Sequence, residues 1–184
     1  LNKKFLGISK ESYEELIKRL THIIHCAANW RFDSSDEELY QTNVQGTASI
    51  IDLAKSVNKN HGLSKLSHIS TAYVSGNLQG KISEDTLTDK YGFITSYEKS
   101  KFQGEKLVQS VKDELPVSIF RPTMVVGDSK SGEIKTFNTI YTLLRLYLKG
   151  KIRFLPMNSS TKINIVPVDF IANTVTELTF NNSA

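Results

Sequence analysis

The sequence contains little cysteine and proline, and it has no long apolar run. Its 184 residues include one cysteine, Cys26, and four prolines. A single cysteine excludes an internal disulfide framework. No apolar run approaches the roughly 20 residues that a membrane-spanning helix needs, and residues 1–5 do not resemble a secretory signal. We therefore predict a cytoplasmic protein without a membrane span, with the Cys26 thiol buried in a strand.

The charge is weakly positive and evenly spread. The formal net charge is +4 and the pI is about 9.0, a sign that suits an anionic partner. Lysines stand beside glutamates, as in residues 98–106, and no arginine cluster or nucleic-acid motif accompanies them. We predict no nucleic-acid partner. His25 and His68 sit within predicted strands and have no second ligand at metal-binding spacing, so we expect satisfied core or strand-end histidines and no metal.

Strand and helix patterns alternate along the first two thirds of the chain. Apolar runs of strand length occupy residues 21–28, 66–71 and 117–120, and helical spacing of apolar residues occupies 11–20, 36–58 and 95–112. The unbroken run 21–28 predicts a strand covered on both faces, as in a parallel sheet. Because the helices are long enough to connect parallel strands, the order predicts an α/β fold with a doubly wound parallel sheet.

The pattern changes after Gly132. Residues 135–148 form an apolar helical pattern, strand-like stretches follow at 152–155 and 162–168, and a last helix begins at Asp169. We interpret residues 1–131 as the sheet domain and residues 132–184 as part of an appendage beside it. The polar, glycine-bearing segment 76–92 is typical of a functional loop within the sheet domain.

Tyr97 and Lys101 are the strongest local signal. They stand four residues apart on a predicted helix, so they share one face. A tyrosine pKa of about 10 is too high for acid–base catalysis at neutral pH, and lowering it by about three units needs roughly 4 kcal/mol. An ammonium about 4 Å away supplies about 4 kcal/mol at an effective dielectric constant of about 20. We predict that Lys101 lowers the Tyr97 pKa; the pair alone leaves open an ordinary surface tyrosine.

Three other features point to a ligand. Thr71 ends a predicted strand, and hydroxyls beyond the carboxyl ends of parallel strands lie where ligands bind; a turn or cap residue is the alternative. Gly46 stands inside a predicted helix, where glycine costs about 1 kcal/mol relative to alanine, so we expect close backbone packing there. Residues 121–127 directly follow a strand, which suits a loop whose backbone meets a ligand; an ordinary turn is the alternative.

These features belong to a set of five motifs. The motifs are His25-x-Ala27-Ala28, Asn43-x-x-Gly46-Thr47, Ser70-Thr71-Ala72-Tyr73-Val74, Tyr97-x-x-Ser100-Lys101-x-x-Gly104-Glu105 and Arg121-Pro122-x-x-Val125-x-Gly127. In this order and spacing they resemble the extended short-chain dehydrogenases/reductases. Within that family, the stretch around Thr71 and the segment Asn29-Trp30 resemble the thioester reductase and fatty acyl-CoA reductase (male sterility) branch. The resemblance covers residues 5–180.

One feature of the family is missing. Its members begin with a strand that runs into a Gly-x-x-Gly-x-x-Gly turn, whose glycines admit the cofactor pyrophosphate to a helix N-terminus. The chain contains no such motif, and Gly7 is isolated. The resemblance therefore implies an N-terminally truncated chain without its first three strands. We expect that such a chain does not bind cofactor measurably and is inactive by itself.

The resemblance also implies an activity and a domain assignment. Residues 1–131 would be a partial NAD(P)-binding Rossmann-like domain, and residues 132–184 part of a substrate-binding region. The intact enzyme would use NADP(H) to reduce an acyl or peptidyl thioester to an aldehyde. Its substrate would sit on the phosphopantetheine of a carrier domain, as in nonribosomal peptide synthetases and carboxylic acid reductases, or on coenzyme A.

The site residues follow from the same resemblance. Tyr97 would donate a proton or hydrogen bond to the developing oxyanion, and Thr71 would add a second hydrogen bond. Lys101 would hold the nicotinamide ribose, while Asn43 would complete a proton relay or brace the site. Cofactor contacts are expected from Ala27, Ala28, Tyr97, Lys101, Arg121, Pro122 and Val125.

Two other functions remain open. An enzyme of the extended family can act on a different substrate, such as a nucleotide sugar or a steroid. A Rossmann-type domain can also serve in binding without catalysis. Such binding domains can lose the tyrosine or the lysine, and both Tyr97 and Lys101 are present here.

Overall fold

The computed structural model describes residues 1, 3–31, 33–135, 137, 139–154 and 162–181. The chain forms two compact units. The first comprises Leu1–Pro122 together with Val175–Ala184, and the second comprises Thr123–Thr174. These bounds differ from the predicted division at residue 131, because the chain leaves the first unit directly after its third strand and returns to it near its end.

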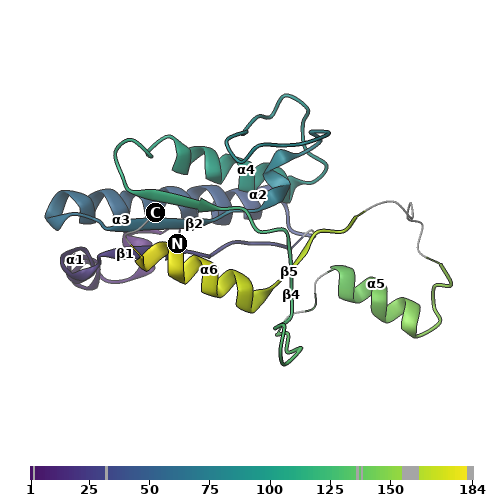
Figure 1. The fold of residues 1–184 in the computed structure, drawn as a ribbon. Coiled ribbons are helices and arrows are strands. Elements are labelled where there is room, and N and C mark those ends of the chain that lie inside the picture. Colours follow the sequence, from purple (N-terminus) through teal and green to yellow (C-terminus); the bar gives the residue numbers. More distant parts are fainter. Residues whose placement is uncertain (2, 32, 136, 138, 155–161, 182–184) are drawn as a thin grey trace. The chain divides into compact units, whose positions relative to one another are not determined.

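A parallel sheet of three strands forms the centre of the first unit (Figure 1). Its strands are β1 (His22–His25), β2 (Lys65–Ile69) and β3 (Val117–Phe120), and they lie side by side in chain order. His25 pairs with His68, and His68 pairs with Ile119. The carboxyl ends of all three strands therefore meet at one edge of the sheet.

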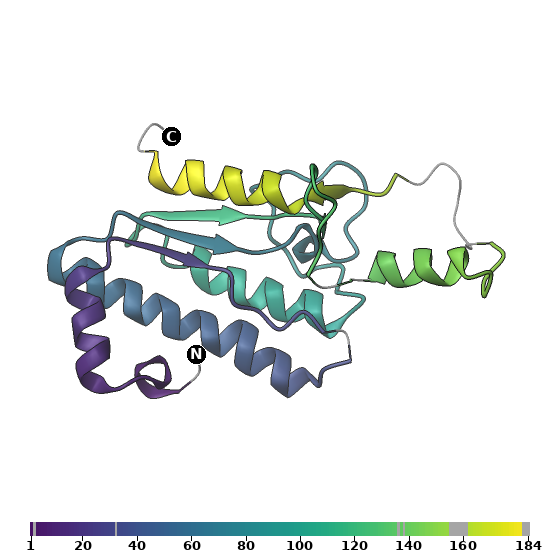
Figure 2. The same cartoon turned by 90° about the horizontal axis from the view of Figure 1, so that it is seen from below.

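Helices cover both faces of this sheet (Figure 2). The helices α3 (Gly46–His61) and α4 (Ser96–Gln109) lie on one face, and α1 (Lys10–Arg19) packs against α3. The last turns of α6 (Val168–Phe180) cover the other face, where the hydroxyls of Ser67 and Thr179 lie 2.7 Å apart. The predicted α/β fold with a parallel sheet is confirmed.

The apolar core lies between the sheet and the helices α3 and α4. Its buried members come from β1, β2, α3, α4 and the segments that follow α3 and α4: Ile23, Ile50, Ile51, Leu53, Ala54, Val57, Leu63, Leu66, Val108, Val111 and Leu115. Burial of so many aliphatic side chains is the main stabilising contribution in the first unit.

The region predicted as one helix over residues 36–58 has three parts. A capping box of Ser35 and Glu38 starts α2 (Asp36–Leu39), a π-helical segment follows at Tyr40–Gln45, and α3 begins at Gly46. Two 3₁₀ turns, Lys4–Gly7 and Ala72–Ser75, complete the first unit. π-helical turns are rare in proteins, and those that occur are often found at functional sites. The middle segment is therefore a place to look for site residues.

The prediction for the run 21–28 was wrong in two respects. The strand β1 ends at His25, and Cys26 is exposed beyond it. Ile24 leaves 38% of its surface exposed, while Ile23 and His25 are buried. Burial therefore alternates along β1, as in a strand that one layer covers more completely than the other.

The second unit contains a two-stranded parallel sheet of β4 (Met124–Val126) and β5 (Ile165–Pro167), with α5 (Thr139–Leu148) and the start of α6. The predicted loop at 121–127 therefore includes a strand. Residues 152–154 form no strand, and the predicted stretch ends at Leu155, outside the described residues. Among the described residues, no helix is both long and apolar enough to cross a membrane.

Candidate functional site

The predicted site residues of the first unit come from the carboxyl edge of its sheet, from α4 and, for Asn43, from the π-helical segment. Ala27 and Ala28 follow β1, Thr71 follows β2, and Pro122 follows β3. Ala27 is exposed and Ala28 is half-buried. Ligands of open parallel sheets bind at this edge. Val125 lies on β4 in the second unit, and its contact with a cofactor stays a prediction.

The ends of the neighbouring strands β2 and β3 hold Thr71 in place. Its backbone is extended, with φ −157° and ψ 151°, and the residue is 4% exposed. The hydroxyl accepts a hydrogen bond from the Tyr73 amide at 3.3 Å and lies 3.4 Å from the Pro122 carbonyl oxygen. The next amide, of Ala72, donates to the same carbonyl at 2.9 Å. The ends of β2 and β3 thus hold the hydroxyl in place.

Tyr97 stands in the first turn of α4, directly after the helix cap. Thr95 and Glu98 form a capping box that fixes the start of this helix. A hydrogen bond joins the side chains of Tyr97 and Thr71. Burial raises the pKa of Tyr97, the Thr71 hydrogen bond lowers it, and Tyr73 and Glu98 raise it. The pKa therefore lies above its usual value, opposite in direction to our prediction.

Lys101 is buried at the end of β2 and is 5% exposed. Its ammonium donates to the Ile69 carbonyl at 2.8 Å. Burial lowers the Lys101 pKa from 10.5 to about 8, while Glu105 and Cys26 raise it. The side chain is still mostly charged at neutral pH, and it carries three N–H donors, of which the Ile69 carbonyl takes one.

Asn43 braces two segments beside α4. Its side-chain oxygen accepts from the Asn29 amide at 2.7 Å, and its nitrogen donates to the Asn29 carbonyl at 2.8 Å and to the Ser100 hydroxyl at 2.9 Å. The side chain is 2% exposed. These contacts tie the π-helical segment to the loop after β1 and to the helix that carries Tyr97 and Lys101.

Close backbone packing occurs at Gly104 rather than at the predicted Gly46. A Cβ atom at Gly104 would lie 2.6 Å from the Asn43 carbonyl oxygen. At Gly46 the nearest atom to such a Cβ, on Leu1, would lie 3.4 Å away, which is an ordinary contact. Gly104 therefore allows α4 to approach the π-helical segment, and this requirement could be inferred from the motif that contains it.

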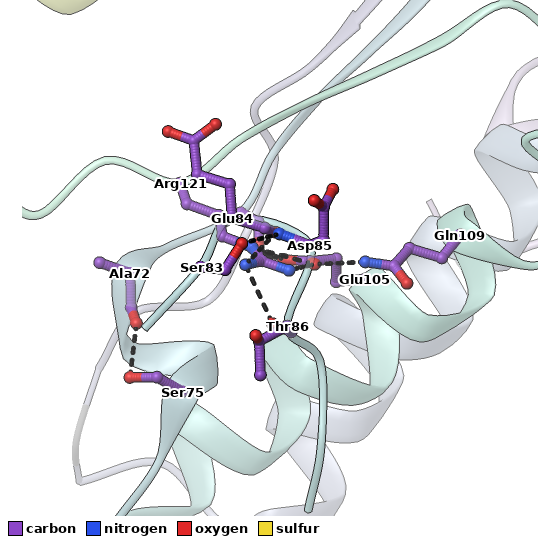
Figure 3. Close-up of polar contacts among 10 residues, drawn as sticks. Ala72, Ser75, Ser83, Glu84, Asp85, Thr86, Glu105, Gln109 and Arg121 are labelled. Carbon is purple, nitrogen blue, oxygen red and sulfur yellow. Dashed lines mark hydrogen bonds and ion pairs between the residues drawn. The ribbon is translucent and has the colours of Figure 1, made fainter. Parts of the chain in front are cut away.

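Arg121 extends toward α4 and the loop before it (Figure 3). Its Nε donates to both carboxylate oxygens of Glu105, at 3.1 and 3.2 Å. Its Nη1 donates to the carbonyls of Glu84 and Thr86, at 2.7 and 3.1 Å. The predicted role of Arg121 as a cofactor contact stays a prediction, and these partners indicate a structural role.

A polar layer that sequence reasoning missed lies beneath the site. The rings of His25 and His68 are 5.3 Å apart, and both are buried. His25 lies 3.1 Å from the Thr47 hydroxyl, but neither ring nitrogen of His68 has a hydrogen-bond partner among the described residues. His68 is therefore a buried residue near the end of β2, but its ring is not satisfied as we predicted. Within the described ranges, no group of three or more His, Cys, Asp or Glu residues is arranged to hold a metal ion.

The sequence profile of the male sterility protein family, an NAD-binding family, matches residues 1–175. The chain belongs to this family. Membership of this NAD-binding family indicates a nicotinamide cofactor.

Two curated relatives of the chain are named as a reductase and as a peptide synthetase. The fatty acyl-CoA reductase wat of Drosophila melanogaster is 30% identical over 196 residues, which cover 91% of this chain and 37% of that protein. The nonribosomal peptide synthetase asaC of Aspergillus flavus is 30% identical over 193 residues, which cover 98% of this chain and 18% of that protein. The chain thus spans well under half the length of the curated relatives it matches.

Solved structures agree on the fold. The terminal R domain from the myxalamid PKS-NRPS biosynthetic pathway has a TM-score of 0.83 and 25% identity, covering 98% of this chain and 45% of that one. The reductase domain of a nonribosomal peptide synthetase from Mycobacterium tuberculosis has a TM-score of 0.74 at 23% identity, covering 96% and 45%. UDP-glucuronic acid 4-epimerase from Bacillus cereus, in complex with NAD, reaches 0.70 at 22%, covering 96% and 54%.

Proposed function

We propose that this chain carries the catalytic residues of a nicotinamide-dependent thioester reductase, which converts an acyl or peptidyl thioester to an aldehyde and a free thiol. The observation that carries the proposal is the hydrogen bond between Thr71, at the carboxyl edge of a parallel sheet, and Tyr97, which stands on the same helix as the buried Lys101. The reductases among the relatives of the chain support the choice of reaction.

The two hydroxyls suit an oxyanion. When hydride adds to a thioester carbonyl, negative charge develops on the carbonyl oxygen, and hydrogen-bond donors aimed at that oxygen stabilise it. The raised pKa keeps the Tyr97 phenol protonated at neutral pH, so it can donate. Thr71 provides a second hydroxyl beside it. Collapse of the resulting tetrahedral species breaks the C–S bond, and the sulfur leaves as a thiolate that takes a proton from water.

Lys101 suits the binding of the cofactor. The cofactor supplies the hydride when it is bound. A buried ammonium with three donors, one of them on the Ile69 carbonyl, fits the hydroxyls of a ribose. Ala27, Ala28 and Pro122 border the same edge of the sheet. Asn43 acts as a brace for this site through its bonds to Asn29 and Ser100.

We extend the proposal to the substrate class and to the form of the cofactor. We propose a thioester on a phosphopantetheine carrier domain or on coenzyme A, because the curated relatives are named a fatty acyl-CoA reductase and a nonribosomal peptide synthetase. We also propose NADPH as the reductant. The cytoplasm stays our prediction for the location.

The test uses the full-length gene product that contains this sequence, purified with and without the changes Tyr97→Phe and Thr71→Val. Cofactor oxidation is followed with an acyl-coenzyme A and with an acyl group loaded on a carrier domain, each with NADPH and with NADH. We expect thioester-dependent oxidation, faster with NADPH. Loss of the phenol should lower kcat by about 100-fold or more, within the range for general acid catalysis.

Lys55→Met is the matched control, because Lys55 pairs with Glu114 on the surface, with 44% and 61% of their side chains exposed. It should leave kcat unchanged. A folded protein that binds NADPH without thioester turnover would overturn the proposal. Turnover that survives in Tyr97→Phe would overturn the role of Tyr97.

A further inference from the structure

A buried ion pair lies one helical turn beyond Lys101. Glu105 on α4 is 0% exposed, and the side chain of its partner Arg121 is 16% exposed. Arg121 donates from Nε to Oε2 and from Nη2 to Oε1 of the carboxylate, and such two-pronged contacts make Arg–carboxylate pairs strong and directional. Glu105 also accepts from Gln109 at 3.1 Å. The carboxylate is therefore held by its own helix and by the end of β3.

The same carboxylate reaches the end of β2. The Ser70 hydroxyl donates to Glu105 at 2.6 Å, and Ser70 immediately precedes Thr71. The Ser70 amide donates to the Phe120 carbonyl at 2.7 Å. One buried carboxylate thus links the strand end that carries Thr71 with the helix that carries Tyr97.

The other side of Arg121 holds the loop between β2 and α4. Nη1 donates to the carbonyls of Glu84 and Thr86, which belong to a turn that the Thr86 amide closes on the Ser83 carbonyl at 3.0 Å (Figure 3). This turn lies in the middle of the loop, between residues 76 and 95. Arg121 is therefore its link to the sheet and the helix.

The two ends of that loop are joined separately. The Asn77 amide donates to the Gly92 carbonyl at 3.1 Å, and the Asn77 side chain donates to the Tyr91 carbonyl at 3.1 Å. A Cβ atom at Gly76 would overlap the Gly92 carbonyl oxygen, so this closure requires glycine. Because the base closes without Arg121, we expect a change at Arg121 to release the middle of the loop and to leave its base intact.

We propose that Glu105 and Arg121 form a positioning clamp, which holds Thr71 against Tyr97 and fixes the loop residues 83–86 over α4. The proposal rests on the proposed function for its catalytic part. Neither residue needs to touch the substrate. A misplacement of about 1 Å in a reacting group can cost about 100-fold in rate, so a clamp at the base of both hydroxyls controls kcat.

A merely structural ion pair makes a different prediction. Removal of one partner leaves a buried charge unpaired and destabilises the fold, whereas replacement of both partners by neutral groups of similar size is often tolerated. The double variant Glu105→Gln/Arg121→Met therefore separates the two roles. It removes both charges and the loop contacts of Nη1 while it keeps the volume of the side chains.

The test compares the full-length gene product with this double variant, with Arg121→Lys and with Lys55→Met. Arg121→Lys keeps the charge but lacks the fork of N–H donors. Three quantities are measured: the unfolding midpoint, amide hydrogen exchange at Ala72 and Thr86, and kcat and KM for thioester reduction. Lys55→Met should match the wild-type protein in all three.

We expect the double variant to unfold close to the wild-type midpoint, to exchange faster at Ala72 and Thr86, and to lose about tenfold or more in kcat with little change in KM. Arg121→Lys should show the same faster exchange at Thr86. Wild-type exchange in the double variant would overturn the clamp. If the wild-type enzyme turns over the thioester, an unchanged kcat in the double variant would overturn it too.

The exchange measurement needs no substrate. If the wild-type protein shows no thioester turnover, the proposed function fails, and the exchange at Ala72 and Thr86 still decides whether the clamp exists. If exchange in the double variant is unchanged while the wild-type protein turns over the thioester, only the clamp proposal fails.

Discussion

The two ends of one sheet differ in what lies between it and the helices α3 and α4. Toward the amino ends of the strands, the layer is aliphatic, with Leu66, Val57 and Val108 almost fully buried. Toward the carboxyl ends, the same layer holds buried polar and charged groups, namely His25, Asn43, Thr47, His68, Ser70, Thr71, Ser100, Lys101 and Glu105. One pair of helices thus covers two regions of opposite character.

The difference separates stability from chemistry. Burial of aliphatic side chains favours folding and does not depend on how the groups are oriented. The aliphatic region at the amino ends of the strands therefore contributes free energy of folding. Buried polar groups cost free energy unless they are hydrogen-bonded, and most of those at the carboxyl end bond to one another or to strand ends. Changes at the amino end should therefore lower stability with little effect on the rate per folded molecule, whereas changes to the site residues at the carboxyl end should lower that rate.

The largest effect is expected at the amino end. Leu66→Ala removes a side chain that is 1% exposed, and such a change costs about 2–5 kcal/mol through lost transfer free energy and the remaining cavity. Urea unfolding of the full-length gene product measures it. The kcat of the folded fraction should stay close to that of the wild-type protein. A large fall in kcat of the folded fraction would break the separation.

Acid should act through the carboxyl end. Burial, with Lys101 nearby, lowers the His25 pKa from 6.5 to about 4, and the His68 pKa falls well below 6.5 for the same reasons. The unfolded chain then binds more protons than the folded one below pH 6.5. Stability is full above that pH and falls as the pH drops toward 4, by up to about 1.4 kcal/mol per pH unit for each histidine.

The matched variant is His68→Leu, measured by urea unfolding across the same range. It removes one titrating group and the ring nitrogens that have no partner among the described residues. We expect a shallower dependence on pH and a gain of about 1 kcal/mol at pH 7, because an unsatisfied buried group is removed. An unchanged slope would show that His68 is not protonated on unfolding.

Gly104 and Gly46 provide a matched pair on two neighbouring helices. Gly104→Ala forces a Cβ atom against the Asn43 carbonyl oxygen, and we expect a loss of about 1–3 kcal/mol, as for overpacking, together with a lower kcat. Gly46→Ala has room and should raise stability by up to about 1 kcal/mol through helix propensity. Equal effects of the two changes would contradict the close approach at Gly104.

The smallest effect is expected at a surface ion pair. Lys55 and Glu114 lie 2.9 Å apart, and both side chains are substantially exposed. Lys55→Met should change the free energy of unfolding by less than about 1 kcal/mol, in contrast to a single removal at the buried Glu105–Arg121 pair. A cost as large as at the buried pair would show that burial does not set the difference.

The sequence predicted the layout of the site better than its electrostatics. Apolar runs of strand length and helical spacing located β2, β3, α1 and α4. Strand direction then placed Thr71 at the sheet edge that Ala28 and Pro122 border. Those inferences depend on local periodicity and on the common direction of parallel strands, and both can be inferred from short stretches of sequence.

The rest depends on contacts between distant segments. The spacing of Tyr97 and Lys101 fixes a shared helix face but not where the long lysine side chain ends, and it ends at the Ile69 carbonyl. The partners of Arg121 lie on α4 and in the loop, which no local pattern encodes. A π-helical segment keeps nearly helical spacing, so Tyr40–Gln45 was not distinguished from the helices around it.

The central claim is that Tyr97 and Thr71 assist hydride transfer to a thioester carbonyl, and isotope transfer tests it most directly. The full-length gene product is incubated with NADPH deuterated at the transferred position and with an acyl thioester, and the product is identified by mass spectrometry. We predict an aldehyde, or the alcohol from its further reduction, with deuterium on the former carbonyl carbon, and product at trace level in Tyr97→Phe. An unlabelled product, or equal labelling in Tyr97→Phe at the wild-type rate, would contradict the account.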